Sequence, residues 1–262
     1  MKKSPLPGPS FPDQDDAQKP RPSRFAWYWG QRMDAFNSAI FVFPLFLIYQ
    51  IGILARGGRG QNGVDYITHS LIELCEQNLH TYLVFLGGML LSYVALLVVL
   101  RQAGHSRAQP FLFLLIESSF YALTMGSLIL FVLQKISDFG PHLSLSETMD
   151  PADVLVISAG AGLHEEILFR LIGMGGLGWL LSGLTGPKRA WIFALVGSSL
   201  LFSLAHHLGP YGEDFRFHAF VYRTLAGVFF ALVYHFRGFA AAVWTHALYD
   251  IYVLSLPLAL GR

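Results

Sequence analysis

Seven long apolar runs alternate with short polar segments along the chain. They cover roughly 36–55, 81–100, 110–133, 151–172, 189–207, 217–236 and 238–258. A helix needs about 20 apolar residues to cross the hydrocarbon core of a bilayer. Because a spanning segment must satisfy every backbone polar group internally, the pattern predicts an all-α fold, a polytopic membrane bundle of about seven transmembrane helices.

Two stretches depart from this pattern. Between the first two runs, "GVDYITHSLIELCEQNLH" has too strong a polar face to span and predicts an amphipathic helix lying at the membrane surface. Its Cys75 is the only cysteine of the chain, which excludes an intramolecular disulfide and a thiolate zinc site. After the fourth run, "LIGMGGLGWLLSGLTG" stays apolar but is rich in glycine, so we expect a re-entrant or interfacial continuation there.

The N-terminal segment has little to bury. Its first 24 residues are rich in proline and charge, which predicts a disordered tail. No apolar core follows Lys2 and Lys3 at the spacing of a signal peptide, and "FAWYWGQRMDAF" suits an interfacial anchor. We therefore divide the chain into a disordered and interfacial tail, 1–35, and one transmembrane domain, 36–262.

Composition and charge agree with a membrane protein. Hydrophobic residues make up 53% and charged residues 13% of the chain, whereas a soluble domain carries about 25% charged residues. The net charge of +1 gives no electrostatic basis for binding nucleic acid. With the N-terminus cytoplasmic, the inside loops hold 11 Lys and Arg residues and the outside loops 5, so the charge bias favours that orientation.

Ionisable residues within the fourth run are the first sign of chemistry. In "GLHEEILFRLIG", Glu165, Glu166 and Arg170 lie in an apolar span, where a charge costs roughly 2.5 to 3.5 kcal/mol on insertion scales. Glu166 and Arg170 are four residues apart on one helix face, which predicts a neutralising ion pair. Glu165 is rotated by about 100° from Glu166 and is predicted to face a cavity.

Two later spans also carry polar residues, each with a neighbour at helical spacing. Phe202 and His206 in "SSLLFSLAHHLG", and His246 and Asp250 in "AAVWTHALYDIYVL", are each four residues apart. Polar groups within the membrane are least costly where they face the interior of the bundle and contact one another. The sequence therefore predicts that these residues converge with Glu165 on one wet pocket.

Other polar residues have plainer explanations. "HEEIL" lacks the second histidine of the zinc-protease pattern because position 168 is Leu, so His164 is expected to be interfacial or cavity-lining. Glu117 is a lone acid in the third span, and both helix packing and a place in the cavity remain open for it. Arg223 and His235, near opposite ends of their helix, are expected to extend towards the membrane surfaces.

The residues of the predicted pocket suit hydrolysis without a serine nucleophile. A carboxylate beside imidazoles can deprotonate water, and an imidazole can stabilise the oxyanion formed at an attacked carbonyl. Proton- or ion-coupled transport also uses acids and histidines at mid-membrane. Transporters usually show internal repeats, and none is present here. A non-catalytic membrane scaffold or immunity protein of the same fold is a third possibility.

The three polar segments also resemble a known family. "EEILFR" (Glu165 to Arg170), "FSLAH" (Phe202 to His206) and "HALYD" (His246 to Asp250) are similar to the ordered motifs of the CPBP intramembrane proteases. This group is also called the CAAX-protease and bacteriocin-processing, or Abi, family. The resemblance lies within about 150–250 and implies that 36–262 is a transmembrane protease domain acting on a membrane-associated protein or peptide.

The resemblance also implies roles for individual residues. Glu165 and His206 would activate water, and His246 with residue 250 would polarise the substrate carbonyl. Glu166 and Arg170 would hold the first motif in place, and Phe202 would have a structural rather than a catalytic role. The last motif commonly ends in Asn, whereas this chain has Asp250. An ionised Asp would repel an oxyanion, so Asp250 would be protonated, bonded to His246 or orienting water instead. We favour the neutral acid, because the usual Asn is itself neutral.

The cofactor, substrate and location are less constrained. We expect no cofactor, with a zinc ion held by His206, His246 and a glutamate as the alternative. Short loops, compact size and no organelle signal favour a prokaryotic inner membrane, crossed several times. Prenylated proteins, bacteriocin leaders and membrane-anchored tails all remain open as substrates.

Overall fold

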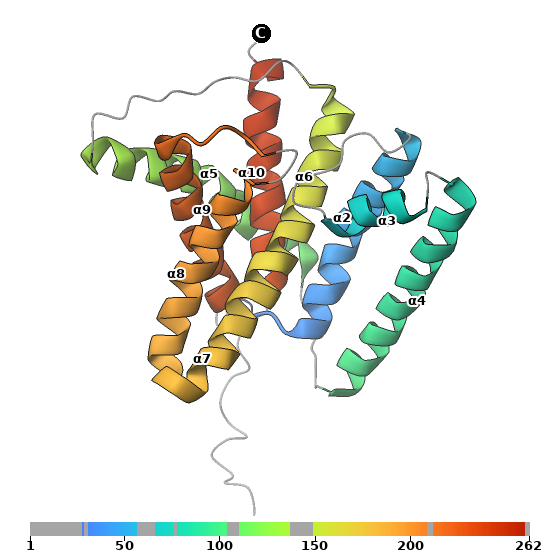
Figure 1. Cartoon of the computed structure of the whole chain (residues 1–262), viewed down its shortest axis with the longest axis horizontal. Helices are drawn as coiled ribbons and strands as arrows, with labels where there is room; N and C mark the ends of the chain where they lie inside the picture. The colour runs from blue at the N-terminus through green and yellow to red at the C-terminus, as the bar shows by residue number, and fades with distance from the viewer. Residues whose placement is uncertain are drawn as a thin grey trace, which may run out of the picture. The chain divides into compact units, whose positions relative to one another are not determined.

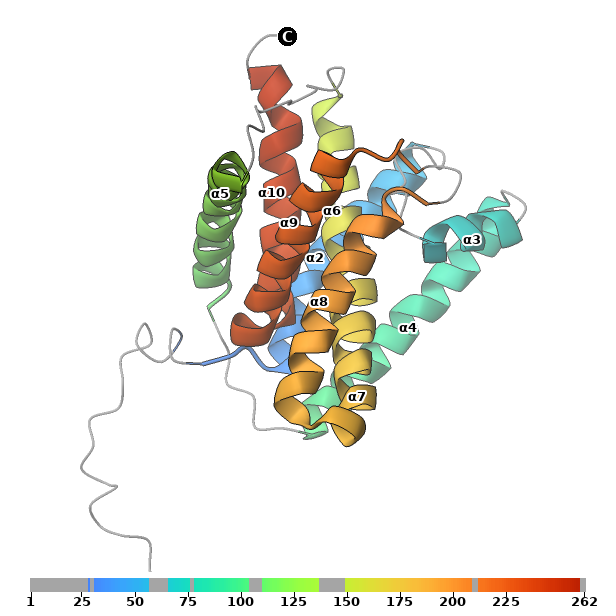
Figure 2. The ribbon, with the colours of Figure 1, turned by 60° about the vertical axis from the view of Figure 1, so that its left-hand side comes forward.

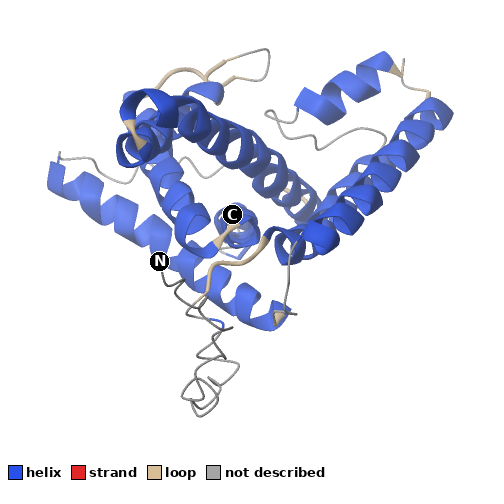
Figure 3. Cartoon of the chain, turned by 90° about the horizontal axis from the view of Figure 1, so that it is seen from below, coloured by secondary structure: helices blue, strands red, loops and turns tan. Residues whose placement is uncertain are grey.

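The computed structural model describes residues 28, 31–56, 66–75, 78–103, 110–136, 149–208 and 212–259. Figure 3 shows helices and no strand in this part of the chain, so the predicted all-α fold is confirmed. The chain divides into two units, Met1–Gln31 and Arg32–Arg262. The predicted disordered tail lies outside the described residues. The helices of the second unit are α2 (Ala35–Ala55), α3 (Tyr66–Leu74), α4 (Leu79–Ala103), α5 (Phe111–Ile136), α6 (Pro151–Glu166), the π-helix η2 (Ile167–Gly176), α7 (Leu177–Thr185), α8 (Pro187–Ala205), α9 (Phe217–Arg237) and α10 (Phe239–Ala259).

Seven helical segments are long and apolar enough to cross a membrane, as the hydropathy pattern predicts. Within the described residues they are Ala35–Ala55, Leu79–Gln102, Phe111–Gln134, Pro151–Thr185, Pro187–Ala205, Phe217–Arg237 and Phe239–Leu256. Large apolar side chains on their outer faces are exposed, among them Leu91 and Val99 of α4 and Phe120 of α5. Such surfaces suit contact with lipid chains, and the protein is a multi-pass membrane protein.

The fourth span is longer than the pattern predicts. The prediction ends it near residue 172, before the glycine-rich stretch, but the helix continues through η2 and α7 to Thr185 without a break. Glycine is a poor helix former in water, but lipid offers the backbone no alternative hydrogen-bond partner. The re-entrant alternative is therefore wrong, and the interfacial continuation stays a prediction. At about 1.5 Å per residue the 35-residue run exceeds the roughly 30 Å hydrocarbon core, so it is tilted or extends beyond it.

The predicted amphipathic segment contains a short helix. It is α3, which is shorter than the predicted stretch and is followed by the buried Cys75. Figures 1 and 2 show α3 running crosswise to α4. This orientation suits a helix that does not span the bilayer.

Small residues let the central helices approach closely. Helix α10 packs against α6, α5, α9 and α2, and its Ala240, Ala241 and Ala242 are fully buried. Small side chains are typical of helix contacts in membranes, where van der Waals packing drives association. Tight turns before α8 and α10 place Gly186 and Gly238 at positive φ, +82° and +102°, which side-chain-bearing residues rarely adopt.

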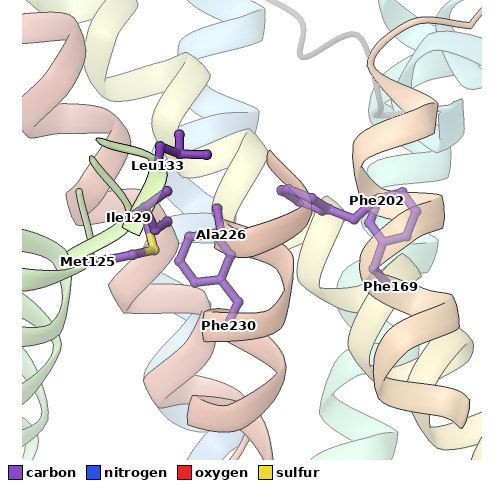
Figure 4. Packing of buried hydrophobic residues seen from close by; sticks show 7 residues of the cluster. All are labelled: Met125, Ile129, Leu133, Phe169, Phe202, Ala226 and Phe230. Carbon is purple, nitrogen blue, oxygen red and sulfur yellow. The ribbon is translucent and has the colours of Figure 1, made fainter. Parts of the chain in front are cut away.

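One apolar cluster lies directly beside His206 and His246. It consists of Met125, Ile129, Leu133, Phe169, Phe202, Ala226 and Phe230. In Figure 4 the rings of Phe169 and Phe202 lie together at one side of the cluster, while Met125 and Ile129 of α5 meet Phe230 of α9. The cluster brings α5, η2, α8 and α9 together around the site.

Candidate active site

Close approach of α6 and α10 sets the distance between their polar side chains. A Cβ atom on Gly162 would lie 2.8 Å from the backbone oxygen of Val243 and 2.9 Å from the backbone nitrogen of Ala247. Only glycine fits such a contact without moving a helix. His246 lies between these two α10 residues, and Glu166 lies one turn after Gly162. The glycine therefore brings the second carboxylate of the first motif to the histidine of the third.

The predicted ion pair is present and fully buried. Arg170 Nε lies 3.0 Å from Glu166 Oε2, and both side chains are 0% exposed. The guanidinium also lies over two aromatic rings, with Cζ 5.0 Å from the centre of Phe202 and 5.9 Å from that of Phe230. Ring faces attract cations, so the rings add to the stabilisation that Glu166 provides. Phe202 thus contacts the first motif, although sequence spacing related it only to His206.

Glu166 also has a second partner. Its Oε1 lies 2.9 Å from His246 Nδ1, and His246 stacks on Phe230 with ring centres 4.4 Å apart and 15° between the planes. A carboxylate only accepts, so the Nδ1–H of His246 donates to Glu166. A single carboxylate therefore bridges the guanidinium and the imidazole. The predicted pair with Arg170 is present, and the contact with His246 is a second one that the sequence did not indicate.

Glu165 faces two imidazoles from other helices. Its Oε2 lies 3.6 Å from His206 Nε2 and 3.9 Å from His246 Nε2, and its side chain is 3% exposed. His206 donates its Nδ1–H to the Phe202 carbonyl at 2.8 Å, so its Nε2 is the nitrogen left for Glu165. The structure thus brings together the three helices that the sequence analysis expected to converge, with Glu165 among them.

Asp250 completes the group at its more exposed side. Its Oδ2 lies 3.6 Å from His246 Nε2, and 23% of its side chain is exposed. His246 therefore meets Glu166 at Nδ1 and both Glu165 and Asp250 at Nε2. The preceding residue, Tyr249, shares a hydrogen bond with the Tyr222 hydroxyl of α9. Sequence spacing singled out neither tyrosine.

Glu117 and His164, two other polar residues of the spans, have hydrogen-bond partners outside this group. Both carboxylate oxygens of Glu117 accept hydrogen bonds from the Arg237 guanidinium, with Nη2 3.1 Å from Oε2. Glu117 also accepts a hydrogen bond from the Tyr121 hydroxyl at 2.8 Å. This ion pair joins α5 to α9, which favours the packing explanation for Glu117. His164 Nδ1 donates to the Gly160 carbonyl at 2.9 Å. Arg237, the partner of Glu117, is the last residue of α9.

The zinc alternative finds no support in the arrangement of side chains. Over the described ranges, no group of three or more His, Cys, Asp and Glu side chains is arranged to hold a metal ion. That no metal is needed remains a prediction, to be tested with chelators.

A comparison with protein families bears directly on these residues. The model of the family described as "Type II CAAX prenyl endopeptidase Rce1-like" matches residues 148–252. This segment is Rce1-like. The Rce1-like segment spans all three motifs, from Glu165 to Asp250, and the resemblance to CPBP proteases is confirmed. No curated protein and no solved structure matches the chain. With its seven apolar helices, the chain is a membrane protease-like protein.

Proposed function

We propose that this protein is an intramembrane endopeptidase that hydrolyses a peptide bond of a membrane-associated protein. The observation that carries the proposal is the position of Glu165. Its buried carboxylate lies 3.6 and 3.9 Å from the Nε2 atoms of His206 and His246, which come from two other helices. These separations exceed a direct hydrogen bond but suit a shared water molecule.

In the proposed reaction, Glu165 takes a proton from this water. At the same time the oxygen of the water attacks the carbonyl carbon of the scissile bond. His206 is held by the Phe202 carbonyl with Nε2 towards the same water. When the carbon–nitrogen bond breaks, the proton on Glu165 passes to the departing amine. A general base must lie within hydrogen-bond reach of the proton that it removes, and a water held between Glu165 and the two imidazoles would meet that condition.

His246 and Asp250 serve the carbonyl oxygen in this proposal. Glu166 accepts from His246 Nδ1, which fixes the ring and supports a proton on Nε2. A protonated Nε2 stabilises the oxyanion, and a neutral Asp250 beside it adds a second donor. Arg170 keeps Glu166 in place through the buried ion pair.

The test compares two buried glutamates. A farnesylated peptide ending in a C-terminal Cys-a-a-X sequence is a suitable probe, because the matching family is described as CAAX prenyl endopeptidases. In purified protein, Glu165→Gln should lower the cleavage rate by about 10²- to 10⁴-fold. Glu117→Gln is the matched control, since Glu117 is equally buried but pairs with Arg237. Equal rates in the Glu165 variant and the parent would refute the proposal.

Two further measurements separate the alternatives. Cleavage should survive a zinc chelator such as 1,10-phenanthroline, and loss of activity that zinc restores would favour a metalloprotease. A coupled transporter would instead move ions across vesicles without cutting any peptide.

Topology belongs to the same proposal. We place the N-terminus in the cytoplasm of a prokaryotic cell, on the basis of the Lys and Arg bias of the loops. Reporter fusions after residues 107 and 214 should then be active on opposite sides of the inner membrane.

A further inference from the structure

An ion pair lies beside the candidate active site and is not used by the proposed mechanism. Arg223 of α9 donates from Nη2 to both carboxylate oxygens of Glu213, at 2.7 and 2.8 Å. The Glu213 backbone N–H in turn donates to the His206 carbonyl at 2.9 Å. The pair is therefore tied to the end of α8 that carries His206.

The charge of Arg223 also interacts with the third motif. It acts on Asp250 and on Tyr249. Glu213, on the other side of the pair, interacts electrostatically with His206 and His207. Arg223 is thus paired with the loop that leads out of α8 and interacts electrostatically with the residues that would bind the substrate carbonyl.

Arg223 has donor capacity that the described part of the chain leaves unused. Its Nη1 atom is buried and has no hydrogen-bond partner among the described residues. A buried donor without an acceptor costs free energy, so such an atom is expected to have a ligand. Arg170 also has nitrogens without hydrogen bonds, but it is 0% exposed and enclosed by Phe202 and Phe230. The Arg223 side chain, unlike that of Arg170, is 23% exposed.

We propose that Arg223 is a binding site for a carboxylate of the substrate, close to the scissile bond. The proposal rests on the proposed function and names a feature of its substrate. The planar fork of a guanidinium suits a carboxylate, which it binds through paired hydrogen bonds. Glu213, whose side chain is 61% exposed, is the intramolecular carboxylate that holds Nη2 when no substrate is bound.

The surroundings of Arg223 already favour an anion. Burial alone would raise the pKa of Glu213, but the hydrogen bond and the charge of Arg223 outweigh burial and lower that pKa below its usual value. A carboxylate next to Arg223 therefore stays ionised at neutral pH. A substrate can offer such a group as its C-terminal α-carboxylate or as an acidic side chain. The C-terminal position of a CaaX sequence favours the α-carboxylate.

The test measures binding apart from cleavage. Full-length Glu165→Gln protein in detergent, in which cleavage is suppressed, is titrated with three fluorescent farnesylated CaaX peptides. One has a free C-terminal carboxylate, one is its carboxamide, and one is a carboxamide with Asp in the last position. We expect the free acid to bind roughly tenfold or more tightly than the plain carboxamide, as for a charge-assisted hydrogen bond.

Variants assign this preference to one side chain. When Arg223→Gln is added to the Glu165→Gln protein, only binding of the free-acid peptide should weaken. The affinities for the free acid and for the plain carboxamide should then become nearly equal. Arg216→Gln, which removes the same charge from an exposed position just before α9, should keep the preference. Glu213→Gln should strengthen binding of the acid, because it removes the competing carboxylate.

The outcomes are distinct. An acid preference that persists in Arg223→Gln, or equal weakening of both peptides, overturns the proposal. Tight binding of the Asp-ended carboxamide would make an acidic side chain the natural source of the carboxylate. If the parent protein shows the acid preference but cleaves nothing, the endopeptidase function fails while the carboxylate site stands. If the parent protein cleaves the peptide but shows no preference for the free acid, the carboxylate site fails while the endopeptidase function stands.

Discussion

Removal of Arg170 should destabilise the protein far more than removal of an arginine from an exposed pair. Arg170 and Glu166 are both 0% exposed, with Nε and Oε2 3.0 Å apart. Breaking a buried pair by removing one partner costs about 3 to 5 kcal/mol, because the remaining charge is left uncompensated. His246 still donates to Glu166 Oε1, so we expect Arg170→Ala to cost about 3 kcal/mol, near the lower end of that range. This corresponds to a roughly 150-fold change in the folding equilibrium.

The assay is unfolding of the purified protein in detergent, followed by heat or denaturant. Arg223→Ala is the matched control: its partner Glu213 is 61% exposed, and such pairs contribute about 0 to 1 kcal/mol. Arg170→Met keeps much of the apolar stem and separates lost packing from lost charge. The double variant Arg170→Met with Glu166→Gln should recover part of the loss, because no buried charge remains unpaired. A stability loss in Arg170→Ala no larger than that of Arg223→Ala would refute this reasoning.

Three other substitutions test the site from different directions. Asp250→Asn should keep most of the cleavage rate and lose less of it above neutral pH than the parent, because an amide donates hydrogen bonds without first being protonated; an Asn variant that is inactive at every pH would show that the anion is needed. Gly162→Ala should cost about 1 to 3 kcal/mol of stability and lower the rate, since its Cβ would lie 2.8 Å from the Val243 backbone oxygen; unchanged activity would mean that this close approach does not position His246. The pKa of Glu213 is lowered on folding, so its pair with Arg223 stabilises the protein above the usual value of 4.5 and loses that effect as pH falls below it. The difference in melting temperature between the parent and Glu213→Gln should therefore shrink at acid pH. A difference that stays constant with pH would contradict the predicted pH dependence of this ion pair.

Local patterns in the sequence determine the spans and one contact of the site. Each run of apolar residues is long enough to cross a bilayer by itself, so all seven spans follow from hydropathy without knowledge of their neighbours. The pairing of Glu166 with Arg170 follows likewise, because residues four apart in a helix are neighbours wherever that helix lies. The three motifs also identified the residues that meet in the structure, since polar groups in lipid need one another.

The tertiary structure alone decided how these helices are aligned. Glu166 contacts His246 across 80 positions of sequence, and nothing in either motif relates the register of α6 to that of α10. That register depends on the backbone contact at Gly162, which looks like any other glycine of an apolar span until its neighbours are known. Arg223 was likewise expected only to reach the membrane surface, because Glu213 lies in a loop whose path the hydropathy pattern does not determine. The glycine-rich stretch after Arg170 was misjudged for a related reason: local propensity predicts a break, but the demand for backbone hydrogen bonds in lipid keeps the helix continuous.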